Sequence, residues 1–593
     1  MKSRLLAFGA LLSAAAPAFA QASDPLAPLS GAPQPPAPAG PAPQVIYPPA
    51  ATQAPPTPPP VPTVVIPKDW RGVFDAIDAG NWASARAGIA TLPPNLLTPL
   101  ATAELYTAKG SPVVDLVSIQ NLLAQAPELP QAEQLAAMAL RRGALTAPTY
   151  VYPRQLVNLG SAPVRYRARP VQGEPLADEL RAALDPLVKA NDHAGAEAQL
   201  LTYAPSLSVE ARAEAGQRVA WIYYANGLDL DARRVADTWR QGAVGDWAPQ
   251  AAWVSGLASW RMGDCNAASA AFQQTARLAQ QRELRAGALY WAARAEQACR
   301  RPGGVAPLLK AAASSAESFY GLLAREALGM ETKLPPDPYV GRDPRIDHLP
   351  NVQRAIELVR IGEPGLAEEL LRHQAKIGLP AEHHALIQLA KKLELPAAQL
   401  WLATNGQPGA IADAADRYPN PAWTPALGWR IDPALAFGHI VQESSFRRTA
   451  VSHAGAVGLM QVLPITAQLV SRNRGVPYSS GALTDPRYNL EYGQSFIEMM
   501  RVNSGTGGQL PRVIASYNAG PLPVARWATI NDKGDPLLWI ESIPYWETRY
   551  YVPAVLRNMW VYQGLNGQDT PTLKAMTEHR WPSFPTSMTH LSH

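Results

Sequence analysis

Apolar residues at helical spacing, from Trp70 to about Ala415, constrain the fold of this chain more than any other feature. This region is rich in Ala, Leu, Arg, Glu and Gln, and its apolar residues recur three or four positions apart, as at Leu116, Ile119 and Leu123. Side chains at that spacing share one face of an α-helix. Runs of alternating β-branched residues, which would indicate strands, are absent from the region. The sequence therefore predicts an all-α protein.

Short turn signatures divide this helical region. Gly80-Asn81, Gly263-Asp264 and Gly362-Glu363-Pro364 each precede a run of small residues. Glycine suits the end of one helix, and small side chains let the next helix pack closely. This pattern is typical of stacked helical hairpins, but its spacing is irregular. We therefore predict an α-superhelical domain over residues 68–340 and a helical linker domain over 341–420.

The amino terminus has the layout of a secretory signal peptide. Lys2 and Arg4 precede an apolar run, which ends in the small-x-small pattern Ala18-Phe19-Ala20. This arrangement predicts export to the periplasm, with residues 1–20 removed by cleavage near Ala20. Because Gln21 rather than cysteine follows the cut, we expect no lipid anchor. No later stretch of ~18 apolar residues predicts a membrane span.

Prolines are concentrated directly after this segment. Residues 21–67 contain 17 prolines in 47 positions and almost no charge. Such a composition disfavours helices and provides little apolar surface to offset the entropy of ordering. We therefore predict a disordered, semi-rigid linker, and nothing in the sequence supports a docking role for it.

Charge and metal-binding residue types exclude several function classes. The formal net charge of +4 is a poor match to a dedicated nucleic-acid binder. Two cysteines, Cys265 and Cys299, cannot form a multi-cysteine zinc site, and export favours a disulfide between them. The pair His383-His384 has no second histidine one helical turn away. We interpret the pair as a solvated helix face and expect no metal and no cofactor.

The sharpest chemical signal begins after residue 420, where prolines break the helical pattern. Asp432-Pro433 suits the start of a helix, and Leu435 and Ile440 form part of its apolar stripe. Glu443 ends that helix and borders its buried face. Burial and the partial negative charge of the helix carboxyl end both favour its protonated form. A carboxylic acid that is protonated near neutral pH can donate a proton to a leaving oxygen. A surface glutamate at a fraying helix end is the alternative.

Four ordered segments then follow from Glu443 onward. They are Glu443-Ser444 with Ala450 to Ala467, which includes Gly455, Gly458-Leu459-Met460-Gln461 and Pro464; Asp485-Pro486 with Asn489 and Gly493; Ser516-Tyr517-Asn518-Ala519-Gly520; and Glu541 to Val552, which includes Ile543-Pro544-Tyr545-Trp546-Glu547-Thr548-Arg549-Tyr550-Tyr551.

These segments resemble the soluble lytic transglycosylases of peptidoglycan (murein), the family 23 glycoside hydrolases with a goose-lysozyme-like catalytic domain. The resemblance implies a helical superhelix followed by a lysozyme-like, mainly α catalytic domain over residues 421–570, with a polar tail over 571–593. It also implies a lyase of cell-wall turnover, which cleaves the β-1,4 bond between N-acetylmuramic acid and N-acetylglucosamine. The product would carry a 1,6-anhydromuramic end. One departure from the family is Gly520-Pro521-Leu522-Pro523, where Gly-Pro-Gly is frequent; this sequence predicts a stiffer loop.

The same resemblance assigns roles to individual residues. Glu443 would be the single general acid and base, since no second acidic residue lies near it in the first segment. The expected substrate-binding residues are Ser452 at the acetamido group, Met460 and Gln461 beside the glycan, Tyr517 orienting Glu443 or the sugar, Asn518 fixing its loop, and Glu547. Glu541 is the less favoured acidic contact, and Glu547 could instead pair with Arg549.

Two other functions stay open at this stage. A lysozyme-type muramidase would hydrolyse the same bond and would need a second carboxylate, for which Asp485 is the candidate. A non-catalytic cell-wall-binding scaffold would use the superhelix as its working surface. Peptidoglycan glycan strands are the expected partner in each case. The sequence does not identify partner proteins, the oligomeric state, or a preference for the ends or the interior of strands.

Overall fold

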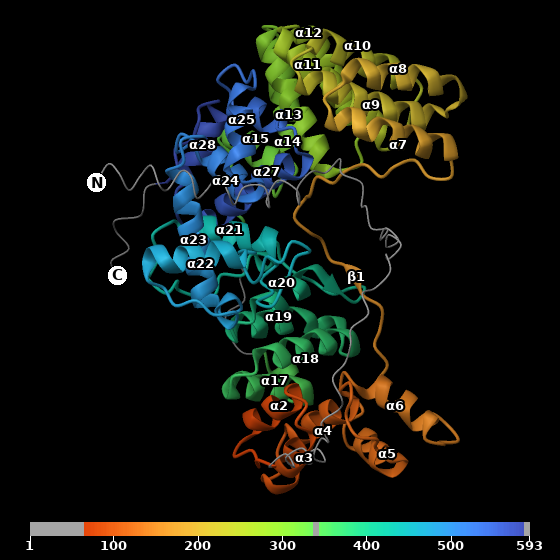
Figure 1. Ribbon diagram of the computed structural model, residues 1–593, viewed down its shortest axis with the longest axis vertical. Coiled ribbons are helices and arrows are strands. Elements are labelled where there is room, and N and C mark those ends of the chain that lie inside the picture. Colours follow the sequence, from red (N-terminus) through yellow and green to blue (C-terminus); the bar gives the residue numbers. More distant parts are fainter. Residues whose placement is uncertain (1–63, 336–342, 586–593) are drawn as a thin grey trace, which may run out of the picture.

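The computed structural model describes residues 64–335 and 343–585, and almost every regular element in it is a helix (Figure 1). The all-α prediction is thereby confirmed. The predicted signal peptide, most of the proline-rich linker and the last eight residues lie outside the described residues. In the described part of the chain, no helix combines the length and apolar character needed to cross a membrane.

The elements fall into three groups along the chain. The first group comprises α2 (Trp70–Asp78), α3 (Trp82–Thr91), α4 (Thr98–Thr107), α5 (Leu116–Gln125), α6 (Ala132–Arg141), β1 (Val157–Asn158), α7 (Pro175–Lys189), α8 (His193–Tyr203), α9 (Val209–Ala225), α10 (Asp229–Trp239), α11 (Trp247–Met262), α12 (Cys265–Leu278), α13 (Arg282–Ala298), α14 (Pro302–Ala313) and α15 (Phe319–Ala327). The second comprises α16 (Pro344–Asp347), α17 (Pro350–Ile361), α18 (Pro364–Ile377), α19 (His383–Lys392), α20 (Pro396–Thr404) and β2 (Asn405–Gly406). The third comprises α21 (Pro433–Glu443), α22 (Pro464–Arg474), α23 (Pro486–Arg501), α24 (Leu510–Ala519), α25 (Pro521–Arg526), α26 (Pro536–Glu541), α27 (Trp546–Leu565) and α28 (Pro571–Thr577).

Two hydrophobic cores cut across the predicted domain boundary at residue 340. Helices α2–α6 share one core with α16–α20, although more than 200 residues separate them along the chain. Polar bonds join the same two groups: Asn351 Nδ2 donates to Glu128 O at 2.8 Å, and Arg354 Nε donates to Leu96 O at 3.1 Å. Figure 1 shows α2 directly below α17. A larger core joins α7–α15 to the carboxyl-terminal domain.

The predicted turn glycines end helices as expected. Gly263 follows α11 with φ 78°, and Gly362 follows α17 with φ 89°. Both values lie in the left-handed region, which a residue with a Cβ atom adopts only at a cost. These turns let consecutive helices reverse and stack.

A long segment with little regular structure, residues 142–174, connects the two parts of the superhelix. It runs from α6 past β1 to α7 along one side of the molecule (Figure 1). On the way, β1 pairs antiparallel with β2, and Arg154 donates to Gln407 at 3.0 Å. This crossing carries residues 163–166 to the carboxyl-terminal domain, where they become part of the site described below.

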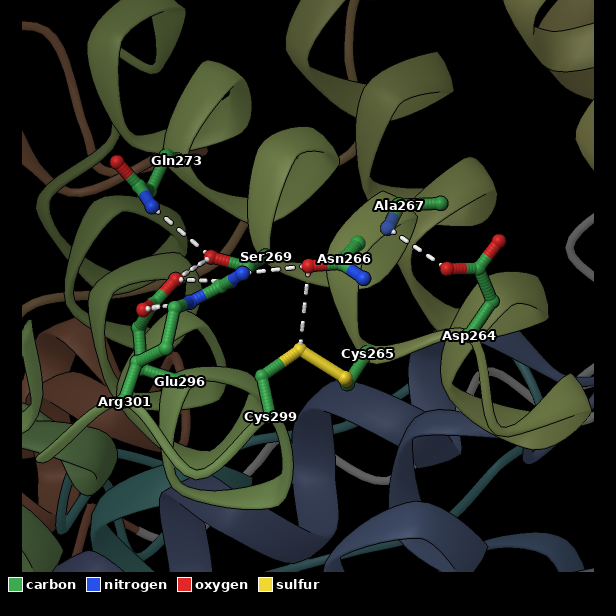
Figure 2. The surroundings of a disulfide bond; sticks show 9 residues. All are labelled: Asp264, Cys265, Asn266, Ala267, Ser269, Gln273, Glu296, Cys299 and Arg301. Atoms are coloured by element: carbon green, nitrogen blue, oxygen red, sulfur yellow. Dashed lines mark hydrogen bonds and ion pairs between the residues drawn. A yellow bond between two sulfur atoms is a disulfide. The ribbon is translucent and has the colours of Figure 1, made fainter.

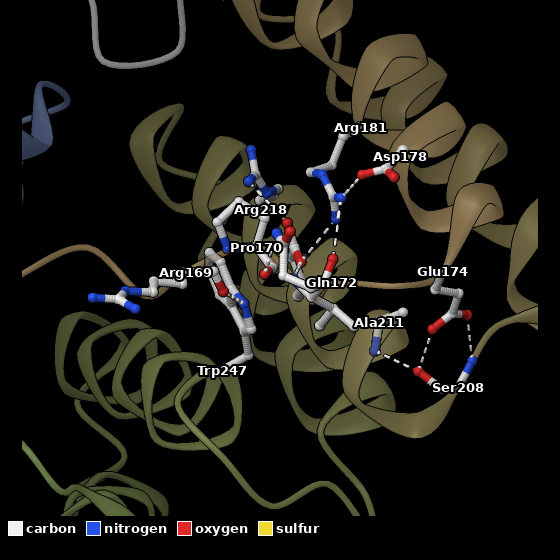
Figure 3. Close-up of polar contacts among 12 residues, drawn as sticks. Arg169, Pro170, Gln172, Glu174, Asp178, Arg181, Ser208, Ala211, Arg218 and Trp247 are labelled. Atoms are coloured by element: carbon white, nitrogen blue, oxygen red, sulfur yellow. Dashed lines mark hydrogen bonds and ion pairs between the residues drawn. The ribbon is translucent and has the colours of Figure 1, made fainter.

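The end of the crossing segment is fixed by a polar cluster, shown in Figure 3. Trp247 Nε1 donates to the carbonyl oxygen of Arg169 at 2.8 Å. The carboxylate of Glu214 on α9 accepts from the Val171 amide at 2.7 Å, and it also pairs with Arg181 and Arg218 at 3.1 and 2.9 Å. A buried carboxylate with several donors holds its partners in one arrangement. The segment is therefore fixed against α9 and α11.

Cys265 and Cys299 form a disulfide, as expected (Figure 2). Cys265 begins α12 and Cys299 caps the end of α13, with Cα atoms 5.5 Å apart. Glu296 near the end of α13 also reaches Arg301, with 2.7 Å between Oε2 and Nε. The bridge ties two stacked helices of the superhelix together.

The prediction of a polar tail from residue 571 is wrong for residues 571–585. Leu573 and Met576 of α28 are fully buried, and Phe584 is 4% exposed. Trp560 Nε1 of α27 donates to Thr572 Oγ1 at 2.8 Å. The reason is that these few apolar side chains, although scattered among polar ones, meet the rest of the protein: α28 packs against α15, and the ring of Phe584 lies against Arg501 of α23. Residues 586–593 lie outside the described part of the chain.

The prediction of a solvated face for His383-His384 is also wrong for His383. Its side chain is buried, and Nε2 lies 2.8 Å from the carbonyl oxygen of Leu402. His384 is more exposed and lies 3.5 Å from Asp413 and 3.7 Å from Asp416. The pair therefore straddles the border between the core and the surface of α19.

Candidate active site

A cavity of about 450 Å³ lies between the carboxyl-terminal domain and the superhelix. From the carboxyl-terminal domain it is lined by Glu443, Ser452, Gln461, Asn518, Glu547 and Tyr551, and from the superhelix by Val164, Arg165, Tyr166 and Tyr320. Five of the seven residues predicted to form the site thus meet in one place. The other two, Met460 and Tyr517, lie behind this lining.

Glu443 is the last residue of α21, as predicted. The helix begins after Asp432, whose Oδ1 accepts from the Ala434 amide at 2.9 Å. Leu435 and Ile440 of this helix are fully buried. Packing of that apolar face against α27 places the carboxyl end of α21, and with it Glu443, at the cavity.

The carboxyl group of Glu443 has a neutral partner. Tyr551 of α27 donates its hydroxyl to Oε1 of Glu443 at 2.5 Å, and Nδ1 of His439 lies 2.7 Å from the same hydroxyl. Burial lowers the pKa of His439 to about 3, so its ring is neutral at pH 7. Since a hydroxyl has one hydrogen, His439 donates to Tyr551 while Tyr551 donates to Glu443.

This environment favours the protonated form of Glu443. Burial raises its pKa from 4.5 to about 7, the bond from Tyr551 opposes the shift, and the charge of Glu547 adds to it. Within the described residues, no lysine or arginine forms an ion pair with Glu443. A carboxyl group in these surroundings can both give and accept a proton near neutral pH.

The hydroxyl of Tyr517 does not bond Glu443 directly. Its hydroxyl donates to the carbonyl oxygen of Met460 at 2.7 Å, while its ring lies 4.5 Å from that of His439. Tyr551, not Tyr517, is the tyrosine bonded to Glu443. Tyr551 lies in the fourth of the sequence segments, but the resemblance implies no role for it. Its position four residues after Glu547 on one helix was the available signal, because residues at that spacing share a helix face.

The loop beneath the cavity is held by backbone contacts. Met460 is fully buried against Gly493, and its amide donates to Asn489 Oδ1 at 2.8 Å. Gly458 has φ 82°, and a Cβ atom there would lie 2.2 Å from the carbonyl oxygen of Leu483. The absence of a side chain at Gly458 therefore lets the two backbone segments approach closely. Met460 contributes packing and a carbonyl group to the site.

Ser452 and Gln461 line the cavity from this loop. Ser452 Oγ accepts from the Ala456 amide at 3.0 Å. Gln461 has φ 47°, and its Nε2 donates to the carbonyl oxygens of Ala450 and Gly458 at 3.1 and 2.8 Å. Both side chains are thus held at the lining by bonds to their own loop.

Asn518 and Glu547 form a pair on the far side of Glu443. Thr548 Oγ1 donates to Asn518 Oδ1 at 2.6 Å, and the amide of Asn518 bonds the carboxyl group of Glu547. Burial raises the pKa of Glu547, and the bond from Asn518 opposes that shift. Glu547 does not pair with Arg549, whose guanidinium lies instead over the ring of Trp221, 3.6 Å from its centre.

Comparison with known families now identifies the domain. Residues 423–540 match the family model described as the transglycosylase SLT domain. We refer to the carboxyl-terminal domain, which contains these residues, as the SLT domain. The matched residues contain Glu443, Ser452, Gln461 and Asn518, whereas Glu547 and Tyr551 lie just beyond them.

Curated relatives of the SLT domain carry related names. The soluble lytic murein transglycosylase of Escherichia coli K12 is 38% identical over 157 residues, which are 26% of this chain and 23% of that protein. The putative soluble lytic murein transglycosylase of Haemophilus influenzae is 28% identical over 285 residues, 45% of this chain and 46% of that protein. The predicted resemblance to these proteins is confirmed. The chain matches less than half the length of each of these two relatives.

A solved structure shares the arrangement of an SLT domain on a helical superhelix. It is an inactive mutant of the lytic transglycosylase Slt from Pseudomonas aeruginosa, with a TM-score of 0.52 and 21% identity. The similarity covers 84% of this chain and 86% of that one. The predicted fold, a helical superhelix followed by a lysozyme-like domain, is thereby confirmed.

The superhelix closes the cavity over the SLT domain. Arg165 of the crossing segment pairs with Glu541 at 2.8 Å, with side chains that are 9% and 1% exposed. Tyr320 of α15 donates to the other oxygen of Glu541 at 2.7 Å. The guanidinium of Arg165 also lies 4.9 Å from the ring centre of Tyr550. Glu541 therefore joins the superhelix to the SLT domain, and sequence reasoning missed Arg165, which lies in no recognised motif.

Asp485, the candidate second carboxylate for a hydrolase, has another role. It is exposed and caps α23 of the SLT domain, where it accepts from the Arg487 amide at 2.8 Å. It does not line the cavity that contains Glu443.

Proposed function

We propose that this protein is a lytic transglycosylase, an enzyme of cell-wall turnover that cleaves the β-1,4 bond between N-acetylmuramic acid and N-acetylglucosamine in peptidoglycan. The observation that carries the proposal is Glu443, a carboxyl group with a pKa of about 7 at a cavity of about 450 Å³. The match of the surrounding residues to the SLT family and the names of its relatives support the substrate class. The predicted export signal and the disulfide support a periplasmic location.

In the proposed reaction, Glu443 acts twice. Its carboxyl group first gives a proton to the glycosidic oxygen as the bond from that oxygen to C1 of the muramic residue breaks. The resulting carboxylate then takes the proton of the C6 hydroxyl of the same sugar while that oxygen bonds to C1. The protons balance, no water is consumed, and the product is a 1,6-anhydro ring. Intramolecular attack of this kind has a high effective molarity.

The remaining residues would support this chemistry from fixed positions. Ser452 lines the cavity, where its hydroxyl can bond the acetamido group of the muramic residue. The acetamido oxygen would bond C1 as the glycosidic bond breaks, and the C6 oxygen would then displace it from C1. Tyr551 and His439 would hold the carboxyl group of Glu443 in one orientation. Tyr517 would act indirectly, through the Met460 carbonyl. Gln461, Asn518 and Glu547 would contact the glycan.

A hydrolase of lysozyme type is the second candidate, and one observation favours it. Glu547 lies close enough to raise the pKa of Glu443, so a second carboxyl group does face the cavity. Inverting glycosidases use such a group to activate water. Because Asn518 already bonds Glu547, we favour a role for Glu547 in contacting substrate over one in activating water.

Analysis of the released muropeptides by mass spectrometry tests the proposal. Purified peptidoglycan is incubated with the wild-type protein and with the Glu443→Gln variant. We expect the wild type to release fragments that are lighter by one water than the hydrolytic products, and the variant to release almost none. Fragments with reducing ends would instead show hydrolysis, and tight binding to the wall without any release would indicate a scaffold.

A further inference from the structure

A cluster of metal-ligand side chains lies outside the cavity that contains Glu443. His384 of α19, Asp413 and Asp416 each place one nitrogen or oxygen atom within 4.8 Å of the other two. None of the three lines that cavity. The pattern around His383-His384 does not predict this cluster, because the two carboxylates follow His384 by 29 and 32 positions. The fold, not the local sequence, brings the three side chains together.

The distances within the cluster resemble those between ligands of one ion. Nε2 of His384 lies 3.5 Å from Oδ2 of Asp413 and 3.7 Å from Oδ2 of Asp416. A charge-assisted N–H···O bond is shorter, about 2.7–2.9 Å. Two ligand atoms that each lie about 2.0–2.1 Å from a tetrahedral Zn²⁺ are about 3.3–3.4 Å apart. The imidazole and either carboxylate are therefore close to the separation that a shared zinc ion imposes.

The cluster is also positioned by its surroundings. The side chain of Asp416 is 1% exposed, and its Oδ2 accepts from the Asp413 amide at 3.0 Å. Nε2 of Gln388, one helical turn after His384, lies 3.3 Å from Nε2 of His384 and 3.3 Å from Oδ1 of Asp416. The side chains of His384 and Asp413 are 24% and 45% exposed, which leaves the cluster open to an ion from solvent. Ligands that are arranged beforehand lose little freedom on binding.

The chemistry of the three side chains favours zinc. Two carboxylates in one cluster repel each other, and a divalent cation between them replaces that repulsion by attraction. The imidazole of His384 adds a nitrogen ligand. Nitrogen combined with carboxylate oxygen suits Zn²⁺, whereas Mg²⁺ and Ca²⁺ prefer oxygen ligands alone. A water molecule, or Gln388 with its amide turned to present the oxygen, would complete a set of four ligands.

We propose that His384, Asp413 and Asp416 form a structural zinc site. The site would tie α19 to residues 407–417, which lead from β2 toward the SLT domain. This segment already contacts two other parts of the protein: the carbonyl oxygen of Asp416 accepts from Gln399 of α20 at 3.0 Å, and Arg417 pairs with Glu317, just before α15, at 2.5 Å. The ion would therefore brace the junction of the linker helices with the superhelix. The inference does not depend on the proposed function.

Metal titration of the full chain, without an affinity tag, tests the proposal. The protein is treated with a chelator, and Zn²⁺ binding is then measured by calorimetry, with the bound metal counted by elemental mass spectrometry. We expect one zinc ion per chain. The temperature of unfolding should rise with the Zn²⁺ concentration, because an ion that binds the folded state stabilises it. Mg²⁺ and Ca²⁺ at the same concentrations should not raise it.

Substitutions of similar size identify the ligands. His384→Gln and Asp416→Asn should each weaken zinc binding about 100-fold, since even the loss of an outer partner of a metal ligand costs about 10–100-fold. Asp413→Asn should have a similar effect, and it provides the test if Asp416→Asn does not fold, because Asp413 is the more exposed of the two.

His193→Gln is the matched control. His193 of α8 is also half-buried and follows an aspartate, Asp192, but that carboxylate caps its own helix by accepting from the Gly195 amide at 2.8 Å. Among the described residues, His193 belongs to no group of three metal-ligand side chains. This variant should keep the wild-type affinity for zinc.

The possible outcomes are distinct. Equal zinc affinity in the wild type and in all four variants would show adventitious binding and overturn the site, as would no binding by the wild type. Binding of Ca²⁺ or Mg²⁺ as tight as that of Zn²⁺ would contradict the assignment of the metal. Release of muropeptides is measured separately, so failure of the zinc site leaves the transglycosylase proposal intact, and the reverse also holds.

Discussion

Two glutamates at the cavity, Glu443 and Glu541, are held in opposite ways. Glu443 meets the hydroxyl of Tyr551, a neutral donor, and its pKa rises to about 7. Glu541 is 1% exposed and meets the guanidinium of Arg165 at 2.8 Å. Both carboxyl groups are withdrawn from water, so burial alone does not distinguish them. The difference lies in the partner, because a cation stabilises the charged form and a phenol does so only weakly.

Under the proposed function, this contrast assigns proton transfer to Glu443 and a structural role to Glu541. A group without a counter-ion can change its protonation state during a reaction, whereas an ion-paired group is fixed as a structural link. The three predictions that follow test whether this division of roles is correct.

The largest effect should be on catalysis. Glu443→Gln keeps the size of the side chain but cannot exchange a proton, and general acid–base catalysis contributes about 10²–10⁴-fold. We expect the rate of muropeptide release to fall about 10³-fold in this variant. The measurement is the initial rate on purified peptidoglycan. A residual rate above a tenth of the wild type would assign the proton transfer to another group.

The next effect is on stability, and its sign should differ between the two sites. Arg165→Met leaves Glu541 buried without its cation, which should lower the free energy of unfolding by about 3 kcal/mol. Glu443→Gln should instead stabilise the protein at pH 8. The wild-type carboxyl group titrates near 7 when folded and near 4.5 when unfolded, so its stability falls as the pH rises from 4.5 to 7. Glutamine carries no such penalty.

Thermal unfolding at pH 5 and pH 8 measures whether each variant is more or less stable than the wild type. The gain of Glu443→Gln over the wild type should be larger at pH 8 than at pH 5, and Arg165→Met should melt lower at both. If both variants were destabilised equally at pH 8, the contrast between the two glutamates would be lost.

The smallest effect should be on the pH profile of the reaction. The wild-type rate should decline above a pH of about 7, as Glu443 loses the proton that it must donate. The bond from Tyr551 holds the pKa of Glu443 down, so Tyr551→Phe should move this decline to higher pH and reduce the maximal rate about tenfold. Tyr517→Phe is the control, because its hydroxyl bonds the Met460 carbonyl; here the decline should stay near 7. An unchanged profile in Tyr551→Phe would exclude a role for that hydroxyl in tuning the acid.

Sequence reasoning succeeded where the signal is local. The helical class follows from spacing, the helix ends at Gly263 and Gly362 follow from turn residues, and Glu443 follows from its place at the end of an apolar helix. The disulfide between Cys265 and Cys299 follows from export and from the presence of only two cysteines.

Sequence reasoning failed where contacts join segments that are distant along the chain. Arg165 and Glu541 are 376 positions apart, and nothing near Arg165 marks it as part of a cavity. The shared core of α2–α6 and α16–α20 is equally non-local. The polar composition after residue 570 predicts a tail, although four buried apolar side chains dock residues 571–585. His439 lies one helical turn before Glu443. The sequence does not predict its bond to Tyr551, because His439 belongs to none of the four segments.

The route of residues 142–174 has a practical consequence for anyone who wishes to shorten this protein. Because Val164, Arg165 and Tyr166 complete the catalytic cavity from outside the SLT domain, an excised fragment that begins near residue 420 would keep its acid but lose one side of the enclosure. Such a fragment would expose the carboxyl group of Glu541 without its cation. If the protein has the proposed function, its selectivity for substrate would therefore depend on the superhelix as well as on the SLT domain.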